Sequence, residues 1–342
     1  GKEDKQNRGK HDKDQMNNED QRRGFIFVSL LKACAKKKDL IRGKRLHDDV
    51  TRKGLLEKIP YLAASVINMY AKCGFLTKAQ EVIEELHDPN IESWNALISG
   101  YANQNHGSQA MDCFKRMKCE GIFPDVVTFT CILKACGKTR DLGKGKEIHD
   151  EIVSRDLLRE DVVLGTAMVD MYAKCGMLLR AQMVFDRLLV RNVVTWNALI
   201  AGYGLHEQFH EALTCYETMR KEGFSPDIVT FICILKACGC VKGGIKKGEQ
   251  IHDEIVTMGL LEKDVVLGSA LVDMYAKCGM VRRAQQVLEE IPIRNIFSWS
   301  SLIQGYVQMD QGQEALNCFD RMESEGLSPD AIIFICVLKA CS

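Results

Sequence analysis

The sequence has little proline and no excess of charge of either sign. Only six prolines occur among its 342 residues, and 46 basic residues are balanced by 46 acidic ones. Apolar residues make up 46% of the chain, so there is ample material for a hydrophobic core. No apolar run is long enough to cross a bilayer, and we therefore expect no membrane segment.

Sequence motifs for catalysis are missing as well. The chain contains no phosphate loop, no dinucleotide fingerprint, no hydrolase elbow and no Cys-x-x-Cys. His149-Asp-Glu151 and His252-Asp-Glu254 match half of a nucleobase deaminase signature, but its Pro-Cys-x-x-Cys half is absent. These histidines recur at one register together with His47, and we expect them to be partly buried packing residues. We expect no enzymatic activity, no cofactor and no metal.

His206-Glu-Gln-Phe-His210 matches the zinc-protease pattern His-Glu-x-x-His. That chemistry requires both histidines on one face of a continuous helix. The aligned segments of the other copies have Gly107 and Gly312 where Phe209 stands. We therefore predict a turn between two helices at this motif, and no zinc site.

The chain does contain a threefold internal repeat. Its three tryptophans, at positions 94, 196 and 299, each begin a segment that continues Leu-Ile-x-Gly-Tyr three residues later. A fixed period of this kind indicates an array of stacked units rather than a globule around one active site. We therefore expect the function to lie on a long surface.

Two further markers divide each long repeat into three units. Met-Tyr-Ala-Lys-Cys-Gly begins at Met69, Met171 and Met274, and Leu-Lys-Ala-Cys begins at Leu31, Leu133, Leu235 and Leu338. Each unit is typical of two amphipathic helices joined by a turn, with stops such as Gly223-Phe-Ser-Pro-Asp227. Neither helix could bury its apolar face alone, so the sequence predicts an all-α solenoid.

The fifteen cysteines recur with the repeat. We expect them to be small buried hydrophobes rather than disulfides, and their number favours a reducing compartment. Residues 1–23 hold thirteen charged residues of both signs and almost nothing apolar, so we expect disorder there and no transit peptide. Ser342 falls inside a first helix whose partner is missing, and we expect the natural chain to be longer.

The three kinds of unit resemble the P, L and S motifs of plant pentatricopeptide repeat proteins. Trp-Asn-Ala-Leu-Ile-x-Gly-Tyr with Gly-x-x-Pro-Asp resembles the P motif, Leu-Lys-Ala-Cys the L motif and Met-Tyr-Ala-Lys-Cys-Gly the S motif. No unit has the Trp-x-x-Leu-Gly-x-x-Tyr of tetratricopeptide repeats. The resemblance divides the chain into 24–59 (L), 60–90 (S), 91–125 (P), 126–161 (L), 162–192 (S), 193–227 (P), 228–264 (L), 265–295 (S), 296–330 (P) and 331–342 (partial L).

The resemblance implies a right-handed superhelix whose concave face, lined by first helices, holds single-stranded RNA with one base per unit. In the family, the fifth and last residues of a unit read a base, and residue two packs against it. The implied reading pairs are Asn95 with Asp125, Thr130 with Asp161, Thr166 with Asn192, Asn197 with Asp227, Ser269 with Asn295, and Ser300 with Asp330. The implied base-packing residues are Val127, Val163, Val194, Val229, Val266 and Phe297.

The chemistry of these pairs predicts a target. Uracil and guanine present a ring N–H, which suits a carboxylate, whereas adenine and cytosine present a ring nitrogen acceptor, which suits an amide donor. Asn at position five leaves room for a pyrimidine, and Ser or Thr for a purine. The pairs predict U-G-A-U-n-A-G from 5′ to 3′, where n reflects the apolar Ile232. Glu92 at position two of the first P unit disfavours the first U contact.

Two points stay open at the level of sequence. The reading residues could merely cap helices, because Asp and Asn are favoured at helix starts. The zero net charge predicts modest affinity and a shallow salt dependence for RNA. Lysines that recur in the first helices could line the groove or be solvated; they are Lys134, Lys174, Lys236 and Lys277.

Relatives with this alternating architecture direct C-to-U editing in plastids or mitochondria, often through deaminase-type domains that follow the repeats. The resemblance therefore implies the target-recognition tract of an editing factor in the mitochondrion or chloroplast, which binds no DNA. Its implied partners are editing accessory proteins or a deaminase domain. RNA splicing or stabilisation is an alternative role, and a protein-binding solenoid is an alternative of another class. The latter predicts apolar side chains at positions two and five throughout.

Overall fold

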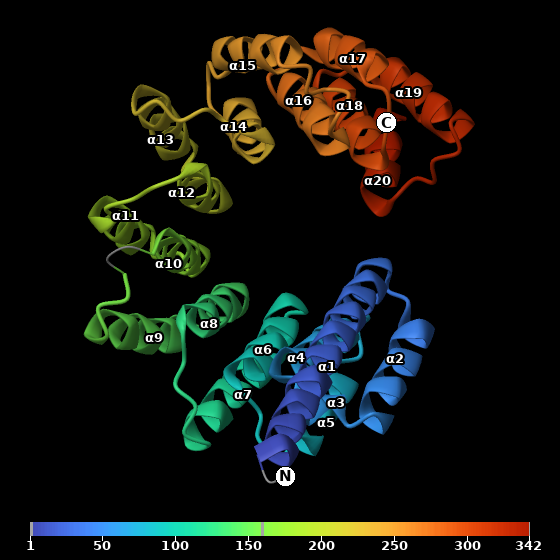
Figure 1. Cartoon of the computed structure of the whole chain (residues 1–342). Coiled ribbons are helices and arrows are strands. Elements are labelled where there is room, and N and C mark those ends of the chain that lie inside the picture. Colours follow the sequence, from blue (N-terminus) through green and yellow to red (C-terminus); the bar gives the residue numbers. More distant parts are fainter. Residues whose placement is uncertain (1–2, 159–160, 342) are drawn as a thin grey trace. The chain divides into compact units, whose positions relative to one another are not determined.

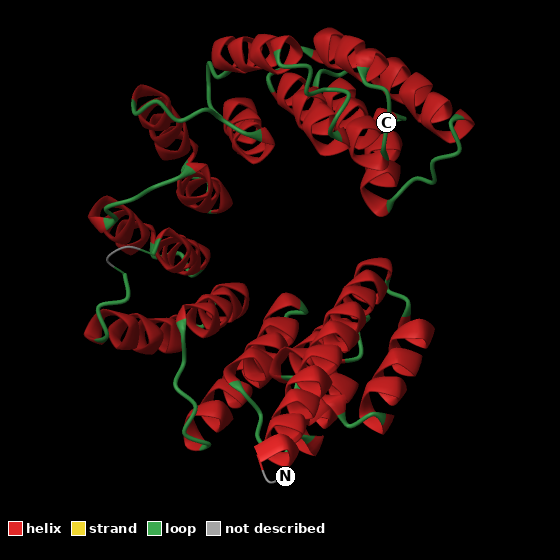
Figure 2. Cartoon of the chain, in the orientation of Figure 1, coloured by secondary structure: helices red, strands yellow, loops and turns green. Residues whose placement is uncertain are grey.

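The computed structural model describes the backbone of residues 3–158 and 161–341, and the side chains from Glu19 onward within these ranges. All regular structure in this part of the chain is α-helical, as the sequence predicts (Figure 2). The helices are α1 (Glu3–Lys37), α2 (Leu40–Arg52), α3 (Leu55–Lys58), α4 (Pro60–Lys72), α5 (Leu76–Glu85), α6 (Ile91–Asn103), α7 (Gly107–Cys119), α8 (Val126–Thr139), α9 (Leu142–Ser154), α10 (Val162–Lys174), α11 (Leu178–Arg187), α12 (Val193–Leu205), α13 (Phe209–Lys221), α14 (Ile228–Cys240), α15 (Ile245–Thr257), α16 (Val265–Lys277), α17 (Val281–Glu290), α18 (Ile296–Gln308), α19 (Gly312–Ser324) and α20 (Ala331–Ala340).

The helices form two compact parts, residues 1–175 and residues 176–342, which we describe separately. In each part, the helices that open successive units pack side by side in chain order. We call these the first helices; they are α4, α6, α8 and α10 in one part, and α12, α14, α16, α18 and α20 in the other (Figure 1). The remaining long helices from α5 onward are the second helices. Within each part they pack on the first helices of their own and the following unit, and α11 packs on α12, the first helix of the following unit. No described helix is long and apolar enough to span a membrane.

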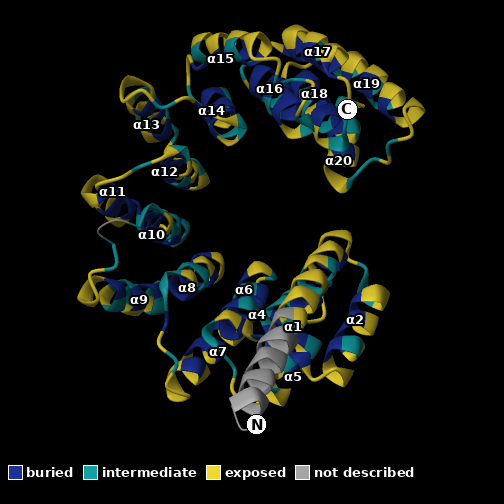
Figure 3. Cartoon of the chain, in the orientation of Figure 1, coloured by how far each residue is buried: buried dark blue, intermediate teal, exposed yellow. Residues whose placement is uncertain are grey.

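The core lies between the two layers of helices, where each pair buries its apolar stripe (Figure 3). Trp94 and Trp299 are fully buried and Trp196 is 2% exposed, so the three copies occupy equivalent core positions. Truncating one of them to alanine would cost about 3–5 kcal/mol. Of the cysteines that end the Leu-Lys-Ala-Cys marker, Cys34, Cys136 and Cys238 are buried and Cys341 is exposed; every cysteine in the described part is a free thiol.

Glycine ends the second helix of each P unit. Gly223 has φ +85°, a left-handed conformation that side chains with a Cβ adopt only with strain. It lets the amides of Gly223 and Phe224 bond back to the carbonyls of Arg220 and Met219, both at 3.1 Å. Pro226 then prevents the helix from continuing, and the chain enters the next first helix at Asp227.

The three L-unit histidines pack against the following S unit, which confirms the structural role expected for them. His47 is 6% exposed and its Nδ1 lies 3.0 Å from the hydroxyl of Tyr70. His149 and His252 make the same contact with Tyr172 and Tyr275, at 2.5 and 2.9 Å. These residues join neighbouring units rather than form a catalytic site.

The amino-terminal segment includes the start of α1, and the disorder expected for residues 1–23 stays a prediction. Gly1 and Lys2 lie outside the described residues, but from Glu3 to Arg23 the backbone belongs to α1. Oppositely charged residues four apart favour a helix. Arg23 Nη2 donates to Glu19 Oε1 at 2.6 Å in this way. The segment contains almost no apolar residues, but its charged and amide residues include good helix formers.

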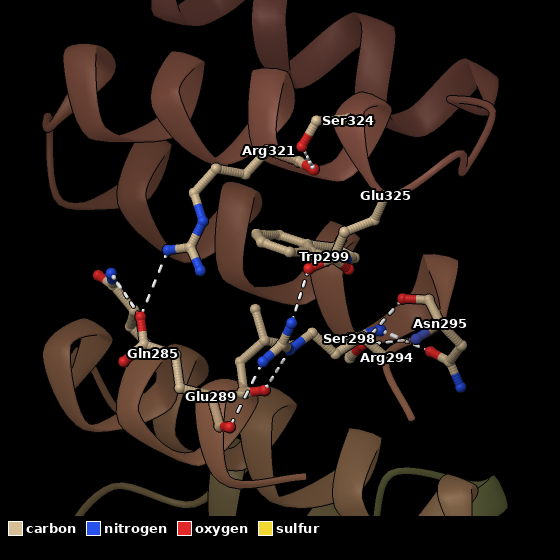
Figure 4. A network of polar contacts seen from close by, with 10 residues as sticks. Gln285, Glu289, Arg294, Asn295, Ser298, Trp299, Arg321, Ser324 and Glu325 are labelled. Carbon is tan, nitrogen blue, oxygen red and sulfur yellow. Dashed lines mark hydrogen bonds and ion pairs between the residues drawn. The ribbon is translucent and has the colours of Figure 1, made fainter. Parts of the chain in front are cut away.

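The third tryptophan takes part in a polar network that the other two lack (Figure 4). Trp299 Nε1 donates to Glu325 Oε2 at 3.1 Å, and Arg294 Nη1 donates to Glu325 Oε1 at 2.7 Å. Trp94 Nε1 and Trp196 Nε1 are buried without a hydrogen-bond partner in the described part of the chain. The repeated core therefore tolerates an unpaired indole N–H, and the third copy satisfies it.

Candidate nucleic-acid interface

Every implied last-position reading residue is the N-cap of the next first helix. In each case Oδ1 accepts a hydrogen bond from the backbone N–H three residues later, at 2.8 or 2.9 Å. These residues are Asp125, Asp161, Asn192, Asp227, Asn295 and Asp330. The cap fixes the side chain at the amino-terminal end of a first helix, so capping and any ligand contact share the same residue.

The structure joins the members of both implied Asn–Asp pairs by a direct hydrogen bond. Asn95 Nδ2 donates to Asp125 Oδ1 at 3.1 Å, and Asn197 Nδ2 donates to Asp227 Oδ1 at 2.9 Å. The two asparagines are only 8% and 6% exposed, so their amides are held within the packed layer of first helices. Each pair thus links the first turn of one first helix to the start of the next.

A threonine completes each of these two pairs. Thr128 Oγ1 donates to Asn95 Oδ1 at 2.6 Å, and Thr230 Oγ1 donates to Asn197 Oδ1 at 2.6 Å. Both threonines are fully buried. Sequence reasoning missed them, although Asp-x-x-Thr before an apolar run is the signal of a reciprocal helix cap.

The environment of Asp227 favours its charged form. Burial by itself would raise the pKa of this carboxyl. Hydrogen bonds to the carboxyl group, chiefly from the Thr230 backbone N–H and then from the Asn197 amide, outweigh burial and hold the pKa of Asp227 below its ordinary value of 3.8. The site therefore presents a carboxylate near neutral pH.

Ser269 and Asn295 form a pair of a different kind. Ser269 Oγ lies 2.9 Å from the Val265 carbonyl oxygen and 3.1 Å from Asn295 Oδ1, and it can donate to either. Asn295 Oδ1 also accepts from the backbone N–H of Ser298. The amide oxygen of Asn295 thus accepts hydrogen bonds from the protein, while Asn295 Nδ2 takes no part in these bonds.

The structure does not bring the other implied partners into direct hydrogen bonds, as far as its described residues show. Thr130 donates to the Val126 carbonyl of its own helix at 2.8 Å rather than to Asp161. Ser300 and Asp330 are both half-buried, and the bond that Asp330 accepts comes from Ile333 N–H. Thr166 lies on α10 and Asn192 caps α12, in different compact parts, so their arrangement stays a prediction.

The six implied base-packing residues are all exposed although they are apolar. They occupy the second position of their first helices, next to the N-caps; their exposed fractions are 53% for Val127, 58% for Val163, 59% for Val194, 52% for Val229, 58% for Val266 and 72% for Phe297. Single exposed apolar residues are common on proteins, but six at one register form a repeated surface feature.

The recurrent lysines are partly neutralised by neighbours. Lys174 Nζ lies 2.6 Å from Asp170 Oδ2, and Lys277 Nζ lies 2.7 Å from Asp273 Oδ2. Lys134 Nζ instead donates to Asn103 Oδ1 at 2.7 Å. These contacts lower the positive charge that the lysines offer to phosphate groups.

The zinc-protease motif is broken by a turn, as predicted. Helix α12 ends at Leu205 and α13 begins at Phe209, so His206 and His210 lie on separate sides of the turn. Glu207 between them has φ +59°. No group of three or more His, Cys, Asp or Glu side chains in the described residues could hold a metal ion.

The repeated helix pairs and their paired capping residues define a helical-repeat solenoid, and family comparisons identify which one. The family model described as the PPR repeat family matches residues 89–138, 191–240 and 294–342. The model described as the PPR repeat matches residues 64–91, 127–157, 166–193 and 269–296. The chain belongs to the pentatricopeptide repeat family.

Similar proteins come from plants. The chain is 33% identical over 317 residues to a chloroplastic pentatricopeptide repeat-containing protein of Arabidopsis thaliana, covering 93% of this chain and 51% of that protein. It is 36% identical over 313 residues to a mitochondrial one of the same organism, covering 92% of this chain and 30% of that protein. The chain therefore spans about half the length, or less, of these relatives.

Solved structures of the family share the fold. The crystal structure of the pentatricopeptide repeat protein PPR10 in complex with an 18-nt psaJ RNA element matches with a TM-score of 0.70 at 21% identity, over 87% of this chain and 45% of that one. The crystal structure of PPR10 from maize matches with a TM-score of 0.66 at 20% identity, over 87% of this chain and 43% of that one.

Proposed function

We propose that this chain binds single-stranded RNA with sequence preference, one base per unit, along its first helices. The observation that carries the proposal is the Asn197–Asp227 pair with its copy Asn95–Asp125. Each pair holds one amide donor and one carboxylate at a fixed register, beside the exposed Val229 or Val127. The fold match to PPR10, which was solved in complex with RNA, supports the same conclusion.

The geometry of these pairs suits uracil. Every hydrogen bond to Asp227 described above uses Oδ1, which leaves Oδ2 to accept the N3–H of the base. The second amide hydrogen of Asn197 can donate to a uracil carbonyl oxygen. Exposed valines supply an apolar surface for the face of a base, as packing in a base-reading groove requires.

The other pairs suit purines. Because Asn295 Oδ1 accepts from protein donors, its Nδ2 is the group left to face a base, and it can donate to the ring nitrogen of adenine. Ser269 is short and leaves room for a purine. Ser300 with the Asp330 carboxylate suits guanine, which presents N1–H and an exocyclic amine. The proposed tract remains U-G-A-U-n-A-G.

Phosphate contacts contribute little in this proposal. The net charge is zero, and two of the four recurrent lysines are paired with aspartates. A protein that neutralises few phosphates loses little affinity as salt rises. We therefore propose modest affinity with a shallow salt dependence, in which base contacts supply most of the selectivity.

The wider role we propose is target recognition in an organellar C-to-U RNA editing factor, with catalysis supplied by a further domain or a partner protein. Two relatives are named as chloroplastic and mitochondrial proteins, which supports an organellar setting. Splicing or transcript stabilisation would use the same recognition surface. A protein-binding solenoid is less well supported, since polar residues occupy position five in most P and S units, with Ala64 of the 60–90 unit as the exception.

The test is binding of a fluorescent RNA that carries U-G-A-U-n-A-G, at fixed salt. The competitors are a permuted RNA, the matching DNA and duplex RNA. We expect a preference for the intact single-stranded RNA, and we expect Asn197→Ser with Asp227→Asn to shift the fourth base from U toward A. Equal or absent binding to all of these would overturn the proposal and favour a protein-binding scaffold.

A further inference from the structure

We infer that Thr230 and Thr128, which belong to the unit after each Asn–Asp pair, determine the choice of U over C at that pair's base. This inference rests on the proposed RNA binding and adds a third residue to each reading pair. The two threonines act as positioning residues, because they hold the asparagine amide and do not face the base themselves. This role follows from which acceptor receives the hydrogen of the threonine hydroxyl.

Thr230 has one hydroxyl hydrogen and two acceptors within reach. Its Oγ1 lies 2.6 Å from Asn197 Oδ1 and 2.9 Å from Asp227 Oδ1. Asp227 Oδ1 already accepts from Thr230 N–H and from Asn197 Nδ2, both at 2.9 Å. Asn197 Oδ1 has the shorter contact, so the hydroxyl hydrogen is assigned to it. The same Oγ1 accepts from the Asp227 backbone N–H at 3.1 Å.

This bond fixes which group of the amide meets the base. Thr230 is fully buried, so the Asn197 oxygen that it binds is turned inward. The amide can then only donate toward a ligand, while the Asp227 carboxylate can only accept. Uracil matches that arrangement with a carbonyl oxygen and N3–H. Cytosine would place the lone pair of its N3 against the carboxylate.

Loss of the hydroxyl would remove this restriction. Asn197 Oδ1 would be a buried acceptor without a partner, which is costly, so the side chain would turn to satisfy it elsewhere. A turning amide offers either its oxygen or its N–H to a base and accommodates both pyrimidines. The expected result is relaxed discrimination rather than loss of binding.

The residues three positions after Asn295 and Asp330 distinguish this role from ordinary helix capping. Ser298 stands at the same register as Thr230 and forms the same reciprocal cap with Asn295. Its hydroxyl donates to the Asn295 carbonyl oxygen at 2.8 Å, and the reading residue Ser269 bonds elsewhere. After Asp330, the position is Ile333, which has no hydroxyl. Within the described residues, the bonds given for the Ser269–Asn295 and Ser300–Asp330 pairs therefore lack the three-residue arrangement of the two Asn–Asp pairs.

The experiment measures dissociation constants for two RNAs that differ only by U or C at the fourth base of the tract. Wild-type protein should prefer U. Thr230→Val, which keeps the shape of the side chain but removes the hydroxyl, should reduce the U-to-C ratio roughly tenfold, the effect of one unpaired buried polar group. Thr230→Ser should keep the ratio. Thr128→Val should lower the ratio at the first base and leave it unchanged at the fourth.

Ser298→Ala is the matched control, because the Ser298 hydroxyl bonds to the backbone of Asn295, whereas the described bonds of the position-five residue Ser269 go to Val265 and Asn295. It should leave the fourth-base ratio unchanged. A folded Thr230→Val protein that keeps the full preference for U would overturn the inference. A fall in the fourth-base ratio in Ser298→Ala would also overturn it, since general loosening would then explain the effect. Wild-type protein that binds neither RNA would instead refute the proposed function itself.

Discussion

Asn197 Nδ2 donates a hydrogen bond of 2.9 Å to Asp227 Oδ1, although the two residues are thirty positions apart in the chain, at the fifth and last positions of one unit. Asn95 and Asp125 repeat this relationship at 3.1 Å. Since each aspartate also caps the next first helix, a single side chain links the stability of the boundary to the surface offered to a ligand. Substitutions at these positions should therefore change both properties.

The charge of Asp227 should stabilise the fold near neutral pH. Its folded-state pKa is lowered, so the stabilising contribution is present above the unfolded value of about 3.8 and is lost as pH falls through the folded pKa. Asp227→Asn keeps a capping side chain but removes the charge. We expect wild type to have the higher melting temperature at pH 7, and the difference to shrink below about pH 4.

Asp320→Asn is a suitable control for that comparison, because Asp320 is exposed on α19. It should change the melting temperature little at either pH. A gap between wild type and Asp227→Asn that is the same at pH 7 and pH 3 would contradict the assigned role of the carboxylate.

The buried histidine contacts should make the fold sensitive to mild acid. Burial lowers the pKa of His252 below its ordinary value of 6.5, with a further contribution from Arg283. The neutral histidine therefore stabilises the fold above pH 6.5, and this contribution is lost as pH falls through the lowered folded-state value. We expect wild type to lose more stability between pH 7 and pH 5 than His252→Gln, measured by thermal unfolding.

His210 provides the comparison, since it is exposed on α13. His210→Gln should follow the pH dependence of wild type. If His252→Gln also follows wild type across this range, the protonation of His252 does not contribute to acid sensitivity.

Glu325→Ala should destabilise the third P unit. It removes the acceptor of Trp299 Nε1 at 3.1 Å and the partner of Arg294 at 2.7 Å (Figure 4). The buried indole N–H would then have no partner, and we expect a loss of about 1–3 kcal/mol. Urea unfolding followed by tryptophan fluorescence would measure it.

Glu222→Ala is the equivalent change in the preceding P unit. There the Arg191–Glu222 distance is 3.7 Å, and Trp196 Nε1 has no hydrogen-bond partner to lose. The expected loss is smaller, because this ion pair is partly solvated. Equal losses in the two variants would show that the Trp299 bond contributes nothing to stability.

Much of this architecture could be predicted from the sequence, because the repeat supplies three aligned copies of each feature. The spacing of Trp94, Trp196 and Trp299 and the Gly-x-x-Pro stops indicate the helix pairs that the structure contains. Phe209 stands where the other two copies have Gly107 and Gly312. The alignment predicts a turn at this position in all three copies, and the structure has this turn directly before Phe209 although the glycine is absent.

Side-chain geometry could not be predicted in the same way. Their positions in the repeat identify Asn197 and Asp227 as ligand-binding candidates. The 2.6 Å bond from Thr230 Oγ1 to Asn197 Oδ1 depends instead on how α12 and α14 pack against each other. The sequence likewise gives no reason for Thr130 to bond within its own helix while Asn95 bonds to Asp125, the N-cap of the next first helix.

Two glycines on either side of the α15 start should respond differently to substitution by alanine. A Cβ at Gly244 would press on the backbone oxygen of Cys238 and lie 2.9 Å from its carbonyl carbon. Because that oxygen belongs to the backbone of α14, relief requires moving a helix, and overpacking of this kind costs about 1–3 kcal/mol or more. A Cβ at Gly248 would meet Met274 Sδ at 2.5 Å instead, and a methionine side chain can turn aside.

We therefore expect Gly244→Ala to lower the urea midpoint more than Gly248→Ala does. Hydrogen exchange should locate the effect, because protection in α14 and α15 would fall in Gly244→Ala while α18 and α19 keep theirs. Solenoids unfold unit by unit, so a local clash should loosen neighbouring helices before distant ones. Uniform loss of protection across residues 176–341 would instead mean that this part unfolds as one cooperative block.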